Sequence, residues 1–134
     1  MRSGLKIGQK ASFGKTITES DVYGFAGLSG DFNPAHINQT EAEQGIFGKR
    51  VAHGFLVGSL ISATIGMKLP GPGTIYMSQT MQFKRPVFFN DTVTATVEVT
   101  DIISREKGIY RLTTQVHNQD GVCVIEGEAV VKYI

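Results

Sequence analysis

Residues 31–36 combine, in one short segment, the side chains that acid–base chemistry requires. Asp31, Asn33 and His36 supply a carboxylate, a carboxamide and an imidazole, and Pro34 lies among them. Because proline keeps the residue before it out of helical geometry, we expect an irregular loop over 31–38 that aims these side chains at one point. An Asp and a His in contact can hold a water molecule and deprotonate it. The same residues also suit an ordinary turn, in which Asp31 and Asn33 cap the chain and His36 lies at the surface.

A second candidate is Gly54, which follows His53 at the start of an apolar segment. The first amides of a helix have no partner within the helix and lie at its positive end. Because glycine has no side chain to block a ligand, the Gly54 N–H can bind an oxygen atom that gains negative charge. A glycine that only lets the chain begin a helix fits this position equally well.

Two further sets of residues are candidates for binding. Lys84 and Arg85, next to Pro86, can bind phosphates, although such a pair at a strand end also suits a solvated edge. The histidines at 36, 53 and 117 lack metal-ligand spacing and a supporting cysteine or carboxylate pattern, so we expect no metal site.

The composition places these candidates in a single domain over residues 1–134. The chain has 13 Lys plus Arg against 12 Asp plus Glu, a net charge of +1, and 41% hydrophobic residues. The sequence has no run of like charges that could bind along a nucleic-acid backbone or an anionic membrane. We therefore expect neither a nucleic acid nor a membrane as a partner. The chain starts without an apolar signal segment, and the apolar stretch 54–67 is shorter than the ~20 residues of a membrane span. With one cysteine, Cys123, and so no internal disulfide, a cytoplasmic protein is expected.

Helices are expected on both sides of the candidate loop. Thr18 can cap a helix whose first turn carries acidic residues, and Gly30 should end that helix just before the loop. A short surface helix is expected over 40–44. The segment 52–67 carries no formal charge and is apolar or small on all sides, which predicts a helix enclosed by other structure.

Alternating apolar and polar residues then predict four strands, over 75–83, 92–99, 109–117 and 122–133. Because no helix separates these strands, the sheet should be largely antiparallel. One apolar helix and one curved antiparallel sheet give an α+β fold in which the sheet wraps the helix.

These motifs resemble the MaoC-like hydratases of the hot-dog superfamily. The matching blocks are Asp31-x-Asn33-x-x-His36, then Ala52-His53-Gly54 at the start of a small-residue helix, then Phe83-Lys84-Arg85-Pro86-Val87 with Asp91-Thr92. The resemblance covers nearly the whole chain and is greatest to the short, single-domain (R)-specific enoyl-CoA hydratases. Asn90 stands where that family often has glycine, and asparagine tolerates the left-handed backbone such a turn needs.

The resemblance implies a hot-dog fold, in which an antiparallel sheet wraps the central helix. It also implies a homodimer whose sheets join side by side, with active sites near the subunit interface. The implied reaction is reversible addition of water to trans-2-enoyl-CoA, giving (R)-3-hydroxyacyl-CoA, without a metal or an organic cofactor. The same reaction serves polyhydroxyalkanoate synthesis and fatty-acid metabolism.

By this resemblance, Asp31 deprotonates the water and His36 holds it and helps return a proton to C2. Asn33 would orient the loop or the water, and the Gly54 N–H would hold the thioester oxygen. The expected substrate-binding residues are Ser62, Lys84 and Arg85.

Two other functions fit the same fold. A hot-dog thioesterase would direct water at the carbonyl carbon. A non-catalytic subunit that binds acyl thioesters would not need both Asp31 and His36, and the presence of both favours the hydratase.

Overall fold

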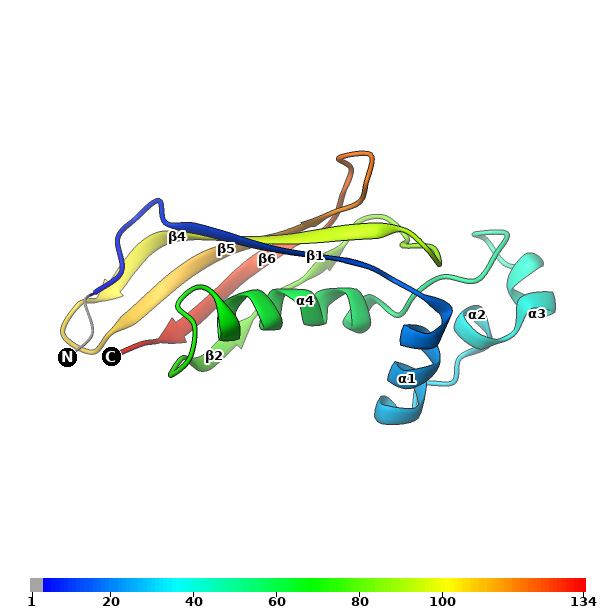
Figure 1. Cartoon of the computed structure of the whole chain (residues 1–134), viewed down its shortest axis with the longest axis horizontal. Helices are drawn as coiled ribbons and strands as arrows, with labels where there is room; N and C mark the ends of the chain where they lie inside the picture. Colours follow the sequence, from blue (N-terminus) through cyan, green and yellow to red (C-terminus); the bar gives the residue numbers. More distant parts are fainter. Residues whose placement is uncertain (1–3) are drawn as a thin grey trace.

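Helix α4 (Gly54–Met67) packs against one face of an antiparallel sheet in the computed structural model of this chain, which describes residues 4–134 (Figure 1). The sheet has the order β1-β4-β5-β6-β2, and the short β3 also pairs with β6. The strands are β1 (Lys10–Thr16), β2 (Ile75–Gln79), β3 (Gln82–Phe83), β4 (Thr92–Ser104), β5 (Ile109–His117) and β6 (Cys123–Lys132). All strand pairs are antiparallel, which confirms the expected α+β fold.

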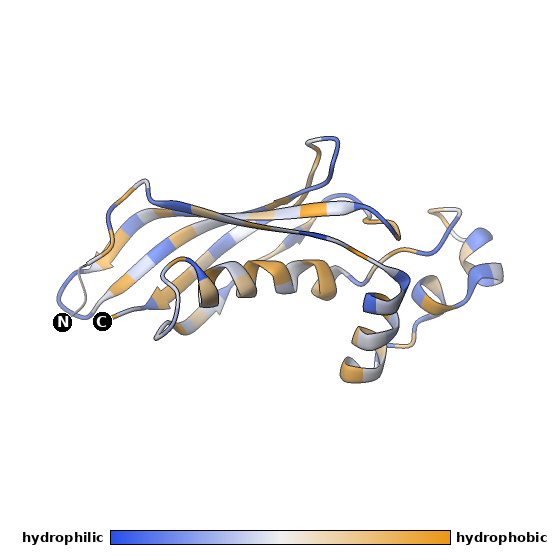
Figure 2. Ribbon diagram, viewed as in Figure 1, coloured by the Kyte–Doolittle hydropathy of each residue, from blue (hydrophilic) through white to orange (hydrophobic). Residues whose placement is uncertain are grey.

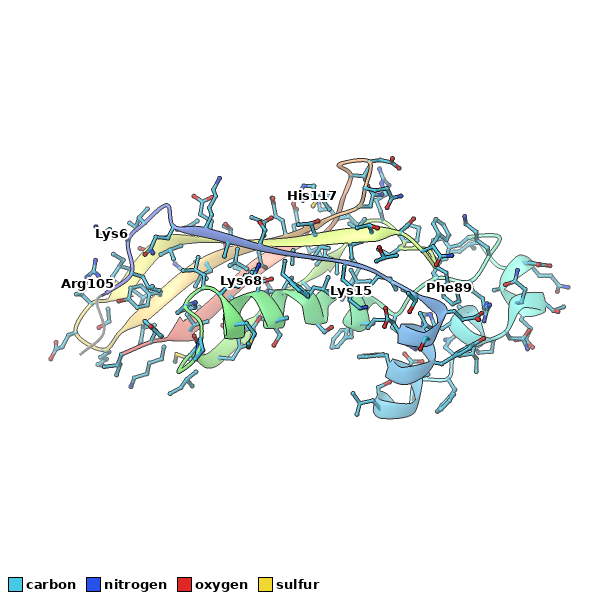
Figure 3. All side chains as sticks on the ribbon, in the orientation of Figure 1. Lys6, Lys15, Lys68, Phe89, Arg105 and His117 are labelled. Carbon is cyan, nitrogen blue, oxygen red and sulfur yellow. The ribbon has the colours of Figure 1, made fainter. Side chains whose placement is uncertain are left out.

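The core lies between α4 and the sheet. Alternate side chains of the long central strands are buried, and they form one core with the apolar residues of α4. Figure 2 shows hydrophobic and hydrophilic residues alternating along these strands and hydrophobic residues along α4. The buried members from β4 and α4 are Val93, Ala95, Val97, Val99, Val57, Leu60, Ile61 and Ile65. Lys68, just after α4, donates to the Ser12 carbonyl oxygen at 2.6 Å and so joins the end of the helix to β1 (Figure 3).

Within residues 4–134, only one side of α4 is covered. Phe55 is 65% exposed and Met67 73% exposed, and Ser59 and Ser62 are also at the surface. The expectation of a helix enclosed on all sides is therefore wrong for the single chain. The sequence did not reveal the open side of α4, because that side lacks the charged residues that usually mark a solvated helix face.

The sheet departs from the sequence prediction at two places. Strand β1 is unpredicted because it is an edge strand with nearly all its side chains exposed, so no alternation marks it. The single strand predicted over 75–83 is instead the two strands β2 and β3, separated at Thr80. A Cβ on Gly127 would lie 1.9 Å from the Thr80 carbonyl oxygen, so the chain crosses β6 there at a distance that only glycine allows.

Three helices project beyond the end of the sheet (Figure 1). The helix predicted between Thr18 and Gly30 is confirmed as α1 (Glu19–Ser29), with Thr18 as its cap and Gly30 left-handed at φ 84°. The loop predicted over 31–38 is only partly irregular, because Pro34 begins α2 (Pro34–Ile37), and proline is favourable at the first helical position. The short helix predicted over 40–44 is α3 (Gln39–Glu43). No helix within residues 4–134 is long and apolar enough to cross a membrane.

Candidate active site

The segment between α1 and α2 is shaped by its own polar side chains. Asp31 Oδ1 accepts a hydrogen bond from the Asn33 amide at 3.1 Å, and Asn33 Oδ1 accepts one from the Ala35 amide at 2.9 Å. Asn33 is therefore the cap of α2, which favours orienting the loop over orienting a water molecule. Asp31 is exposed and has a second carboxylate oxygen available for chemistry.

The His36 ring is fixed by the chain that precedes α4. Its Nδ1 lies 2.7 Å from the Val51 carbonyl oxygen. Since a carbonyl oxygen only accepts, Nδ1 carries a proton, and Nε2 is the nitrogen left to act on a ligand. The Val51 amide in turn donates to the Ala35 carbonyl oxygen at 3.1 Å, so Val51 contacts α2 through both of its backbone polar groups.

His53 is a member of the site that the sequence argument did not assign. It is 1% exposed and stacks on His36, with 3.9 Å between ring centroids and 29° between the ring planes. Its ring also contacts Phe25, with 4.9 Å between centroids, and its Nε2 donates to the Asp31 carbonyl oxygen at 2.9 Å. One side chain thus contacts both His36 and the backbone of Asp31. Its position next to Gly54 was visible in the sequence, but the stacking depends on how the chain folds.

Gly54 begins α4 beside a tightly packed aromatic ring. Its N–H is the first helical amide and donates no hydrogen bond to any of residues 4–134. A Cβ at this position would lie 2.7 Å from Cε1 of Phe83, so even alanine forces that ring to move. The missing side chain therefore leaves room for Phe83 as well as access to the amide.

A cavity of about 430 Å³ brings several candidates together. His36, Gly54, Phe83, Lys84 and Arg85 all line it, whereas Asp31 does not, although its carboxylate lies within 4.8 Å of the two histidine ligand atoms. Lys84 forms an ion pair with Glu126 at 2.8 Å, and this hydrogen bond raises the pKa of the Lys84 ammonium. Both basic residues are exposed, at the mouth of the cavity where an anionic group would enter.

Ser62 lies apart from this group. It lines a second cavity of about 410 Å³ between α4 and β2, which shares only Phe55 with the first. Tyr76 and Gln79 also line this cavity, and the Tyr76 hydroxyl donates to Gln79. Burial raises the pKa of Tyr76 to about 12, so this phenol stays protonated at neutral pH.

Asp31, His36 and His53 each offer a possible metal ligand, and the three atoms lie within 4.8 Å of one another. The spacing of these residues did not predict this cluster, because the fold brings residue 53 to residues 31 and 36. A shared ion would have to lie in the planes of both imidazoles, about 2.0–2.1 Å from each nitrogen. The planes of the stacked rings are inclined by only 29°, so they meet far beyond bonding distance. The geometry does not fit a metal centre.

The arrangement fits acid–base chemistry beside a polarised carbonyl. A carboxylate and an imidazole close to each other can share one water molecule, and the Gly54 amide can stabilise a developing oxyanion. The basic residues at the cavity mouth suit a substrate with phosphate groups.

Known proteins are similar to this chain in both sequence and fold. The family described as "MaoC like domain" matches residues 3–120. The (R)-specific enoyl-CoA hydratase of Rhodospirillum rubrum is 52% identical over 128 residues, which is 95% of this chain and 87% of the relative. The (R)-specific enoyl-CoA hydratase of Aeromonas caviae is 45% identical over 128 residues, 96% of this chain and 95% of the relative. A solved structure of the A. caviae (R)-hydratase involved in PHA biosynthesis superposes with a TM-score of 0.94 at 44% identity, covering 99% of this chain and 100% of that one.

Proposed function

The chain belongs to the MaoC-like family, and from this membership we infer that it is an (R)-specific enoyl-CoA hydratase of the hot-dog superfamily. The enzyme is a hydro-lyase that adds water reversibly to trans-2-enoyl-CoA and gives (R)-3-hydroxyacyl-CoA. The observation that supports this inference is that His36 lines one cavity with Gly54 and lies close to the Asp31 carboxylate, in a chain 52% identical to a hydratase of that specificity.

The reaction needs a base for water and an acid for carbon. Conjugation with the thioester makes C3 of the substrate electron-poor, so the water oxygen bonds to C3 while Asp31 takes a proton. The electron pair moves to the thioester oxygen and forms an enolate. The proton then passes from Asp31 to Nε2 of His36, which carries no proton while Nδ1 donates to Val51, and Nε2 delivers it to C2. The addition is complete, and the Asp31–His36 pair ends with the protons it began with.

The remaining assigned residues bind and orient the substrate. The Gly54 N–H, at the positive end of α4, stabilises the enolate oxygen as it gains charge. Lys84 and Arg85 bind phosphate groups of CoA at the mouth of the cavity, and Asn33 holds the loop that carries Asp31. Ser62 contacts the acyl chain where the substrate extends into the second cavity.

An assay of crotonyl-CoA with two readouts tests this function. We expect loss of the enoyl absorbance without release of free thiol. Release of thiol would indicate a thioesterase, and binding of crotonyl-CoA without either change would indicate a non-catalytic thioester-binding protein. Chiral analysis of the 3-hydroxybutyryl product should give the R enantiomer.

The enzyme acts as a homodimer joined through an edge patch that we define as Phe55, Ile75, Tyr76 and Met77. Ile75 is 59% exposed and Met77 53% exposed on β2, which is an edge strand of the sheet. Exposed apolar edge strands favour pairing with another chain. Phe55 belongs to the patch and also lines the cavity with His36, so this interface would adjoin the active site.

Light scattering coupled to gel filtration measures the mass of this assembly. We expect twice the chain mass for the wild type and a shift toward the monomer for Met77→Lys. A fully active monomer would contradict the dimer. We also propose a cytoplasmic location, since Cys123 is a free thiol and the fold uses no disulfide among the residues described.

A further inference from the structure

The Arg50 side chain contacts two of the projecting helices, α1 and α3. Its side chain is only 14% exposed. Nε donates to Gln39 at 3.0 Å, Nη1 donates to the Tyr23 hydroxyl at 2.7 Å, and Nη2 pairs with Glu19. Three separate N–H groups of one guanidinium therefore contact α1 and α3 at the same time.

The guanidinium also lies over an aromatic ring that follows β3. Its central carbon is 4.6 Å from the centroid of the Phe89 ring. Figure 3 shows Phe89 near the start of β4, beside the projecting helices. The hydrogen bond from Arg50 lowers the pKa of Glu19, and the contact with Tyr23 raises the pKa of Arg50, so the group remains an ion pair at neutral pH.

The backbone that leaves Arg50 leads directly to His36. Val51 accepts the hydrogen bond from His36 Nδ1 at 2.7 Å and donates to Ala35 at 3.1 Å. Ala52 donates to the Val87 carbonyl oxygen at 2.8 Å, which fixes the same segment to the chain behind the cavity. The His36 ring is therefore hydrogen-bonded to the residue that directly follows Arg50 in the chain.

We infer that Arg50 is a positioning residue for His36, a role that rests on the proposed hydratase function. Its planar fork supplies three donors in fixed directions, which the single ammonium of lysine cannot reproduce. It contacts no cavity-lining residue that binds the substrate, so its loss should change the alignment of His36 and not the affinity for CoA. A displacement of about 1 Å in a catalytic group can reduce the rate by about 10²-fold.

The test compares Arg50→Lys with Arg111→Lys. Arg111 is a matched control because it pairs with Asp101 at 2.8 Å and Glu128 at 3.4 Å on the sheet, away from the site. For Arg50→Lys we expect kcat to fall about 10- to 100-fold, with KM for crotonyl-CoA changed by no more than about twofold. Arg111→Lys should keep both constants. Tyr23→Phe, which removes one acceptor and keeps the ring, should give a smaller loss of kcat in a folded protein.

The state of the His36 ring is a second readout that needs no activity. In 15N NMR spectra the wild type should show the tautomer with a proton on Nδ1, and Arg50→Lys should show that signal weakened or shifted while Arg111→Lys retains it. An unchanged His36 signal in Arg50→Lys, or an unchanged kcat, overturns the positioning role. Absence of hydratase activity in the wild type would reject the proposed function instead, and the NMR comparison would still decide whether Arg50 holds His36.

Discussion

The body formed by α4 and the sheet differs from the helical segment of residues 18–53 in what holds it together. In the body, fully buried apolar side chains of the sheet, among them Val97, Leu112 and Val131, pack in one core with the apolar residues of α4. In the helical segment, Val22 and Ala26 are also buried, but the side chains of the site are held mainly by hydrogen bonds such as His36 to Val51 and His53 to Asp31, with His53 stacked on His36. The stability of the protein therefore resides mainly in the body, whereas the geometry of the reaction depends on a few hydrogen bonds in the helical segment. Activity and stability should be separable by mutation.

We expect Asp31 and His36 to show the largest difference between loss of activity and loss of stability. Asp31→Asn keeps an oxygen that can accept from the Asn33 amide, and His36→Gln keeps a donor for Val51, so both variants should fold. Each should lose about 10²–10⁴-fold in kcat, because a positioned acid or base typically contributes that much. Turnover of crotonyl-CoA and thermal melting are the measurements. Near wild-type turnover in either variant would remove that residue from the mechanism.

Gly54 lies at the boundary between the two regions and should show the next largest effect. Gly54→Pro removes the N–H donor at the first helical position, where proline is tolerated. We expect turnover to fall about 10²–10³-fold below that of Gly54→Ala, which corresponds to about 3–4 kcal/mol.

Gly54→Ala is the necessary control because its methyl group also displaces the Phe83 ring while the amide remains. Comparing the two variants therefore isolates the donor from the steric effect. Equal turnover in a folded Gly54→Pro and a folded Gly54→Ala protein would rule out the Gly54 oxyanion site.

At Ile61, in the body, we expect a mutation to reduce stability while activity is retained. This side chain is fully buried under the sheet, and truncating it to alanine leaves a cavity. The free energy of unfolding should fall by about 2–5 kcal/mol. In urea titrations and assays below the transition, kcat per folded molecule should stay near wild type. A large loss of kcat in folded Ile61→Ala protein would show that the body also sets the reaction geometry.

The same contrast explains how much the sequence could predict. The periodicity of Val93 to Val99 and the capped helix between Thr18 and Gly30 are local patterns, and the structure confirms both. Strand β1 left no such pattern because its side chains face solvent, and β2 and β3 separate where Thr80 crosses Gly127.

In the site, the motif pointed to Asp31, His36 and Gly54, and the fold places His36 in one cavity with Gly54 and near the Asp31 carboxylate. The contacts of His53 and Arg50 could not be predicted from a sequence motif. His53 acts through stacking on His36, and the partner of Arg50 at Glu19 is 31 residues away. These contacts depend on the path of the chain and not on residue spacing.

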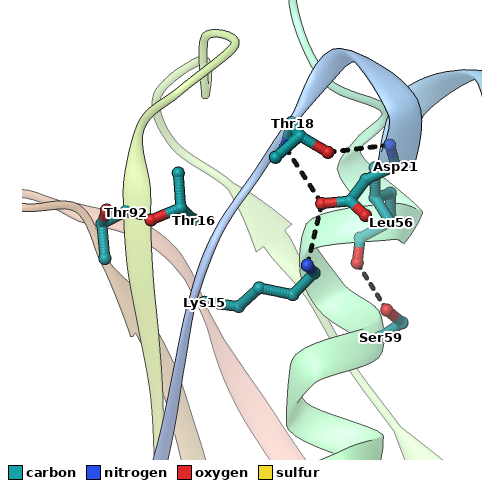
Figure 4. A network of polar contacts seen from close by, with 7 residues as sticks. All are labelled: Lys15, Thr16, Thr18, Asp21, Leu56, Ser59 and Thr92. Atoms are coloured by element: carbon teal, nitrogen blue, oxygen red, sulfur yellow. Dashed lines mark hydrogen bonds and ion pairs between the residues drawn. The ribbon is translucent and has the colours of Figure 1, made fainter.

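The smallest expected effect concerns the polar contacts that start α1. Asp21 accepts from the Thr18 amide at 3.0 Å and pairs with Lys15 at 3.0 Å (Figure 4). The Thr18 hydrogen bond, with a smaller contribution from Lys15, lowers the pKa of Asp21 below its usual 3.8. A carboxylate with a lowered pKa stabilises the folded state above its unfolded-state pKa, and this stabilisation is lost as the pH falls through the folded value. Asp21→Asn should therefore cost about 1 kcal/mol at neutral pH.

Urea unfolding of the wild type and Asp21→Asn across pH tests this expectation. The difference in unfolding free energy should be constant at neutral pH and should shrink as the pH falls below the usual value of 3.8. Lys15→Met removes the ion pair and leaves the bond from the Thr18 amide, so its effect should be smaller than that of Asp21→Asn. Neither variant disturbs a contact with His36 or Val51, and both should keep kcat. A pH-independent difference would show that Asp21 stabilises α1 without its charge, and a loss of kcat would show that the polar contacts of the helical segment act as one unit and not separately.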